Sequence, residues 1–128
     1  MQFSEKMMDH FENPRNVGSL DESDPSVGLA NVTAGQCGDV TKLWLKISDD
    51  GIIEDVRFKT FGCGAAIASG SLATEWLMGK SIEDAVSIKD AHIAEELDLP
   101  APKVHCSVLT EDAVRAAIDD WKRKNNKD

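Results

Sequence analysis

The chain has 128 residues, of which 41% are hydrophobic and 29% are charged, and its formal net charge is −9. These values describe one soluble domain with a modest core and exclude disorder of the whole chain. They also argue against nucleic acid or an anionic membrane as the main partner, because no surplus of lysine and arginine is available to bind phosphate groups.

The first part of the chain predicts a short helix followed by a loop. Ser4 can cap a helix over residues 4–12, and Pro14 stops it because the residue before a proline is pushed out of the helical region. Residues 16–27 show no period and contain glycine and proline, which is typical of a loop. Since neither a signal-peptide layout nor an apolar run of about 18 residues occurs, a cytoplasmic location is expected.

Two alternating segments predict a β-hairpin. Residues 40–47 alternate between apolar side chains and a more polar set that includes Trp44, and residues 52–60 alternate in the same way. Between them, Asp49-Asp50-Gly51 supplies residues that tolerate the backbone conformation of a tight turn. Residues 30–33 can add a third, shorter strand.

The second half of the chain predicts helices. One runs from Cys63 to the stop at Gly79, the next begins at the cap Ser81, and a third covers residues 90–97. The prolines of residues 99–103 favour an extended path, and a final helix is expected from residue 104 to about residue 124. Its core face is predicted to comprise Val104, Val108, Val114, Ala117, Ile118 and Trp121.

A block of strands followed by a block of helices predicts an α+β fold. We expect a small three-stranded antiparallel sheet with helices packed mainly on one face. The sequence contains no repeat and no internal linker, so residues 1–128 are expected to form a single domain.

The three cysteines carry the strongest chemical signal. Cys63 lies between two glycines at the turn from a strand into a helix, where the helix N-terminus favours the thiolate that attacks electrophiles and binds soft metals. Cys37 stands two residues before Asp39, and Cys106 directly follows His105. An odd number of cysteines without a secretory signal favours metal or thiol chemistry over a disulfide framework.

Each of these candidates also has an ordinary structural interpretation. A lone cysteine is often a small buried side chain, Asp39 can be a turn residue, and His105 can be a surface residue at a helix start. His10 and His92 have no such neighbours and are expected to be solvated. The absence of a CxxC pair disfavours a thiol oxidoreductase, whereas a structural zinc module stays open, because spacing alone does not name the metal.

Several motifs point beyond generic chemistry. They are Asn13-Pro14-Arg15-Asn16-Val17-Gly18, Cys37-Gly38-Asp39, Phe58-Lys59-Thr60-Phe61-Gly62-Cys63-Gly64, Ile93-Ala94-Glu95-Glu96-Leu97 and His105-Cys106. Together they closely resemble the NifU N-terminal (IscU-type) family of iron–sulfur cluster assembly scaffolds, over nearly the whole chain. The resemblance implies a scaffold rather than an enzyme. A [2Fe–2S] cluster would be assembled on it from iron and from the sulfur of an IscS-like cysteine desulfurase, and then transferred to apo iron–sulfur acceptors.

The same resemblance assigns the ligands. It implies that Cys37, Cys63 and Cys106 bind the cluster as thiolates, with Asp39 and His105 as contenders for the fourth position. Zinc can occupy these positions in the cluster-free form. Cys37 and Cys106 are expected to lie in more flexible surroundings than Cys63 and so to be the better receivers of sulfur.

The resemblance also implies protein partners, among them ferredoxin and frataxin-like proteins. A docking strip for DnaK/DnaJ-type chaperones is expected at Leu99, Pro100 and Lys103, which match the family's chaperone-recognition segment. The second proline of that segment is displaced by one residue, to Pro102. The strip is expected to be extended and exposed.

Overall fold

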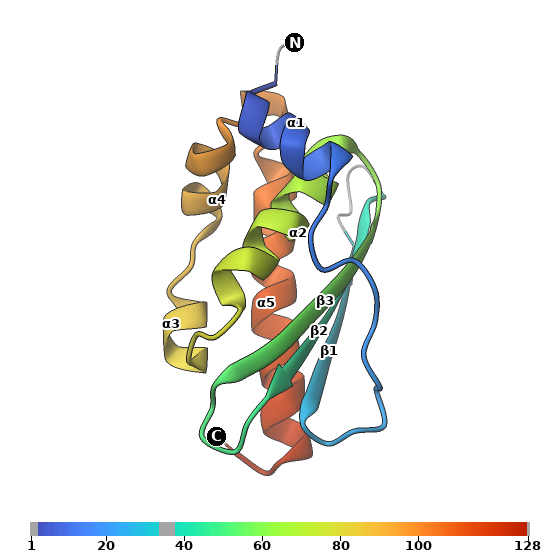
Figure 1. Cartoon of the computed structure of the whole chain (residues 1–128), viewed down its shortest axis with the longest axis vertical. Helices are drawn as coiled ribbons and strands as arrows, with labels where there is room; N and C mark the ends of the chain where they lie inside the picture. Colours follow the sequence, from blue (N-terminus) through green and yellow to red (C-terminus); the bar gives the residue numbers. More distant parts are fainter. Residues whose placement is uncertain (1–2, 34–37, 128) are drawn as a thin grey trace.

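The computed structural model describes residues 3–33 and 38–127 (Figure 1). Its elements are α1 (Glu5–Glu12), β1 (Val27–Thr33), β2 (Val40–Ile47), β3 (Ile53–Phe61), α2 (Gly64–Leu77), α3 (Ile82–Val86), α4 (Asp90–Leu97), the 3-10 helix η1 (Ala101–Lys103) and α5 (His105–Lys124). The strands form one antiparallel sheet in the order β1-β2-β3, and the helices gather on one side of it (Figure 1), which confirms the expected α+β architecture. Within the described ranges, no helix combines the length and the apolar character needed to cross a lipid bilayer.

The main core lies between the sheet and α5. Leu45 and Phe58 from the inner face of the sheet are buried together with Trp121 from α5. Helix and strand come unusually close at Gly28 in β1, where a Cβ atom would lie 2.1 Å from the carbonyl oxygen of Ala117. Glycine therefore lets the long helix lie directly against β1.

A second core joins α1, α2 and α4. Met7, Leu72 and Ile93 are fully buried in it. Small residues dominate α2, and a Cβ atom at Gly70 would lie 2.7 Å from the ring of Phe58 in β3. This close contact sets the position of α2 on the sheet and therefore the position of its first turn.

Two expectations for the sheet were wrong. β1 begins at Val27 and is longer than the predicted segment 30–33, so the end of the expected loop is strand. Trp44 lies on the outer face of the sheet, yet only 3% of it is exposed. Leu29 and Arg57 stand opposite Trp44 on the two neighbouring strands, so long side chains flank the ring on both sides.

Two expectations for the C-terminal region were also wrong. Val108 is 40% exposed, and Cys106 and Leu109 take the core positions of that turn. The reason is that Cys106, Leu109 and Ala113 follow one another at three- and four-residue spacing, whereas Val108 is rotated away from that face. Before α5, the segment after Leu99 forms the 3-10 turn η1 instead of an extended strip, and Leu99 itself is buried in the second core.

His10 was expected in solvent but is 2% exposed, because its side of α1 packs on α2. Its Nε2 atom lies 3.1 Å from Glu75 Oε1, and its Nδ1 atom lies 2.7 Å from Ser71 Oγ. Since a carboxylate only accepts, Nε2 carries the proton and the Ser71 hydroxyl donates to Nδ1. Ser71 Oγ in turn accepts from the backbone N–H of Arg15 at 2.9 Å, which completes a network around a neutral imidazole.

This network predicts that the fold weakens in mild acid. Burial, followed by the nearby Arg15 guanidinium, lowers the pKa of His10 below its ordinary value of 6.5, while the Glu75 and Asp9 carboxylates oppose that shift. The unfolded chain therefore binds this proton more readily. The stabilisation is complete above the unfolded pKa of 6.5 and is lost as the pH falls from there through the lower folded pKa.

The test compares wild type with His10→Gln, which cannot titrate. Thermal unfolding is measured at about pH 7.5 and about pH 5.5. Between these two pH values the free energy of unfolding should fall more in wild type than in His10→Gln, with a difference of at most about 1.4 kcal/mol per pH unit. All other side chains are the same in the two proteins, so the difference between their two losses of stability isolates the contribution of His10. Equal losses in the two proteins would contradict the assignment.

Candidate metal centre

The turn after β3 places Cys63 at the N-terminus of α2. Cys63 is the N-cap residue, and its carbonyl oxygen accepts from the backbone N–H groups of Ala66 at 3.1 Å and Ile67 at 3.2 Å. Its side chain makes no capping hydrogen bond and is half-buried. The sulfur is therefore directed away from its own helix, toward the start of α5.

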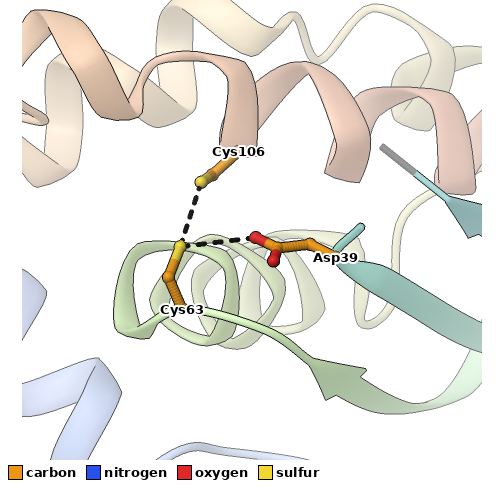
Figure 2. Close-up of side chains that lie close together, drawn as sticks. All are labelled: Asp39, Cys63 and Cys106. Carbon is orange, nitrogen blue, oxygen red and sulfur yellow. Dashed lines mark hydrogen bonds between the residues drawn. The ribbon is translucent and has the colours of Figure 1, made fainter. Parts of the chain in front are cut away.

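Three potential ligand side chains meet at this point (Figure 2). Cys63 Sγ lies 3.4 Å from Cys106 Sγ and 3.4 Å from Asp39 Oδ2. One ligand atom from each of the three residues lies within 4.8 Å of the other two. They come from the segment before β2, the start of α2 and the first turn of α5, so distant parts of the sequence build one compact donor set.

Glycine makes room for the carboxylate. A Cβ atom at Gly62 would lie 2.4 Å from Asp39 Cγ, a distance that no real contact allows. Gly38, directly before Asp39, has a φ of +73°, a backbone conformation that side chains rarely adopt. Asp39 is buried as a result, with its carboxylate turned toward the two thiols.

The electrostatic surroundings favour negative charge at this point. The N-termini of α2 and α5 both face the centre, and neither first turn contains an acidic residue. The positive ends of two helix dipoles therefore act on the thiols of Cys63 and Cys106. Two soft sulfur donors and one hard oxygen donor suit a thiophilic metal with one more weakly held position.

His105 lies beside this donor set. Its Nδ1 atom lies 3.1 Å from the carbonyl oxygen of Pro102, and its Nε2 atom lies 3.5 Å from Cys106 Sγ. Because a carbonyl only accepts, the Pro102 contact places the imidazole proton on Nδ1 and leaves the Nε2 lone pair on the side of Cys106. The histidine is thus presented as a nitrogen donor next to the thiols.

The other predicted ligand, Cys37, lies outside the described residues, so its role stays a prediction from the sequence. The expectation that Cys106 lies in flexible surroundings was wrong, because it is fully buried in α5 and belongs to the second core. Cys63 is the more exposed of these two thiols.

Comparison with known proteins decides the family. The sequence pattern of the "NifU-like N terminal domain" matches residues 2–128. The chain belongs to the NifU-like N-terminal family. The resemblance stated from the sequence is thereby confirmed.

Curated relatives in this family cover almost the whole chain. The "Iron-sulfur cluster assembly scaffold protein IscU" of Haemophilus influenzae is 62% identical over 124 residues, which are 97% of this chain and 98% of that protein. The protein of the same name from Escherichia coli K12 is 61% identical over 124 residues, 97% of each chain.

Solved structures agree with the NifU-like fold. A candidate iron–sulfur cluster assembly scaffold for the SUF system from Fervidobacterium islandicum superposes with a TM-score of 0.75 at 21% identity, covering 90% of this chain and 95% of that one. The N-terminal part of a NifU-like protein from Brucella abortus gives 0.73 at 21% identity, covering 94% of each chain.

One element of this NifU-like site was not anticipated from the sequence. The Pro102 carbonyl orients His105, and every backbone carbonyl looks alike in a sequence. Only the position of Pro102 in the sequence could have indicated this contact. Pro102 stands three residues before His105, the first residue of α5, and a carbonyl at that spacing can reach the side chain of the first helical residue.

Proposed function

We propose that this chain is a scaffold on which an iron–sulfur cluster of the [2Fe–2S] type is assembled and from which it is passed to apo-proteins. The observation that carries the proposal is the compact donor set of Cys63, Cys106 and Asp39 at two helix N-termini. Its support from sequence is the identity of about 60% to relatives named as scaffolds. The cluster is cargo, and the protein is a carrier rather than an enzyme.

The ligand roles follow from charge and softness. Thiolates of Cys37, Cys63 and Cys106 suit the soft iron–sulfide core, and the fourth position falls to Asp39 or His105. An oxidised [2Fe–2S] core carries a charge of about +2, so three thiolates bring the site to about −1 and a carboxylate to about −2. A harder fourth ligand is the one most easily displaced, which is what delivery requires.

Sulfur delivery is proposed to come from an IscS-like cysteine desulfurase. The Cys63 thiolate attacks the outer sulfur of the partner's persulfide, the S–S bond breaks, and the partner's own thiolate leaves, so that Cys63 becomes the persulfide. Of the two thiols that the structure describes, Cys63 suits this role better than Cys106 because it is half-buried instead of fully buried. Cys37, which the sequence favours as a receiver, stays a proposed alternative. Release of that sulfur as sulfide takes two electrons, and we assign their delivery to a ferredoxin. A frataxin-like protein is proposed as a further partner.

Chaperone docking is proposed at Leu99, Pro100 and Lys103. Pro100 and Lys103 are half-buried and reachable at the surface, whereas Leu99 is buried in the second core. A DnaK/DnaJ-type chaperone would therefore have to draw Leu99 out of that core. The segment is coupled to the centre, since η1 carries the Pro102 carbonyl that orients His105.

Zinc is the second candidate cargo. Thiolate, carboxylate and imidazole donors also suit Zn²⁺ in a tetrahedron, so we propose zinc for the cluster-free form. A purely structural zinc module is disfavoured by the scaffold relatives.

The test is anaerobic assembly of a cluster. Incubation with ferrous iron, cysteine, a cysteine desulfurase and a reductant is expected to produce visible charge-transfer absorption, which should disappear from the protein when apo-ferredoxin is added. The same mixture without the desulfurase serves as the control. A colourless product that contains only zinc under all of these conditions would support the structural module instead.

A further inference from the structure

Two threonine hydroxyls lie on the inner face of the sheet, next to the metal centre. Thr41 on β2 and Thr60 on β3 stand directly opposite each other in the strand register, and their Oγ1 atoms lie 3.2 Å apart. Thr41 is 2% exposed, and Thr60 is half-buried. The next pair along the same face is Leu43 and Phe58, which belong to the main core. The two hydroxyls, which we call the threonine pair, therefore form a polar spot between the core and the centre.

The threonine pair has a hydrogen-bond donor to spare. Each hydroxyl brings one proton, and the bond between the two oxygens uses only one of them. Within residues 3–33 and 38–127, neither hydroxyl makes any other hydrogen bond. Little water reaches Thr41, and a buried donor without an acceptor costs free energy. The pair can therefore receive an acceptor that approaches along the inner face.

Asp39 brings an acceptor to the same face. Its carboxylate lies against Gly62, where a Cβ atom would be 2.4 Å from Asp39 Cγ. This contact continues the register of the two strands, because Asp39 stands two residues before Thr41 and Gly62 two residues after Thr60. Residues two apart in an extended chain point to the same side, with Cα atoms about 7 Å apart. Rotation of the Asp39 side chain away from the thiols can thus bring a carboxylate oxygen to a threonine hydroxyl.

Asp39 loses its present donor when the centre binds a metal. In the structure, its Oδ2 atom accepts from the Cys63 thiol over 3.4 Å (Figure 2). A bound metal requires thiolates, which cannot donate a hydrogen bond. A carboxylate that leaves the metal is then a buried charge without a donor, next to negative sulfur. The spare hydroxyl of the threonine pair supplies the donor that this displaced carboxylate needs.

We propose that the threonine pair receives the Asp39 carboxylate each time it leaves the metal. One hydroxyl donates to the carboxylate while the bond between the two threonines persists, so Thr41 and Thr60 are positioning residues and not ligands. This inference rests on the proposed function, because it explains why Asp39 is the ligand that yields. The free energy of the displaced carboxylate falls, and the metal is released faster than from a centre without the pair.

The experiment uses Co²⁺ alone as the probe, because its visible absorption reports thiolate ligands and its transfer to EDTA can be followed in time. The double variant Thr41→Val/Thr60→Val keeps the shape of both side chains and removes both hydroxyls. We expect it to release Co²⁺ roughly tenfold more slowly, since a hydrogen bond to a charged group is lost. Thr41→Ser/Thr60→Ser, which keeps both hydroxyls, should stay within about twofold of wild type. The same holds for Thr74→Val, which removes the hydroxyl of a buried threonine in α2.

A double-mutant cycle separates positioning from damage to the fold. In the Asp39→Ala protein no carboxylate is left to receive, so adding the two valine substitutions should change the release rate by less than about twofold. With Asp39 present, the two substitutions should leave the equilibrium affinity for Co²⁺ within about twofold of wild type, because the pair binds the carboxylate only during release.

Three results would overturn the proposal. They are equal slowing with and without Asp39, release from the serine variant as slow as from the valine variant, and release from the valine variant as fast as from wild type. Co²⁺ binding requires neither iron nor a desulfurase, so these outcomes do not depend on whether a cluster is assembled.

Discussion

Cys63→Ala is expected to fold normally and to retain no cluster. Because Cys63 is half-buried and makes no side-chain capping bond, its removal costs the fold little. It does remove a soft ligand from the middle of the donor set, 3.4 Å from both Cys106 Sγ and Asp39 Oδ2. Water cannot replace a thiolate toward an iron–sulfide core. Visible absorption and bound iron after anaerobic assembly should fall roughly tenfold or more.

The control for this prediction lies on α5. Val108→Ala alters an exposed side chain two residues from Cys106 and should leave the cluster intact. Cys106→Ala is expected to lose the cluster too, and since Cys106 is buried, its circular dichroism and thermal unfolding are measured alongside. The sequence predicts the same loss for Cys37→Ala. If two of the three single variants kept a full cluster spectrum, the three-cysteine site would be wrong.

Asp39→Ala is expected to assemble a cluster and to deliver it more slowly. In the proposed site the carboxylate is the hard donor and adds negative charge to that of the three thiolates, so we expect the cluster to open at this position. Without it, His105 Nε2, which lies beside Cys106, can close the shell as a neutral ligand. The rate of transfer to apo-ferredoxin at equal cluster loading should fall roughly tenfold.

Two further variants sharpen this measurement. Asp39→Asn keeps the size of the side chain and removes its charge, so it should behave like Asp39→Ala if charge is the cause. Gly62→Ala keeps the carboxylate but displaces it, because the added Cβ would lie 2.4 Å from Asp39 Cγ. If Asp39→Ala transfers the cluster to apo-ferredoxin as fast as wild type does, Asp39 is only a turn residue and has no role in delivery.

Much of the fold was predictable because its signals are local. The Asp49-Asp50-Gly51 turn lies between two alternating segments, and the structure has β2 and β3 there as an antiparallel pair. Ser81 caps α3 through its side chain, which accepts from the backbone N–H of Asp84. Turn and cap preferences act within a few residues, so they can be read without knowledge of the rest of the chain.

The wrong expectations share a physical cause. His10, Trp44 and Val108 were each assigned from their own segment, and each differs because another element decides its burial. α2 covers His10, neighbouring strands flank Trp44, and the face of α5 that meets the second core excludes Val108. Tertiary packing overrides local polarity at such positions, because burial depends on which surfaces meet.

The candidate site, like the fold, has features that the sequence determined and others that only the tertiary structure decided. By itself the sequence determined that Cys63 lies at a strand-to-helix turn and Cys106 in the first turn of a helix, since glycine, periodicity and capping act locally. Only the tertiary structure decided that these two turns meet, 43 positions apart in the chain, with Asp39 joining them from 24 positions before Cys63. That meeting depends on α2 and α5 packing against one sheet through close contacts at Gly70 and Gly28, and no local preference encodes such a contact.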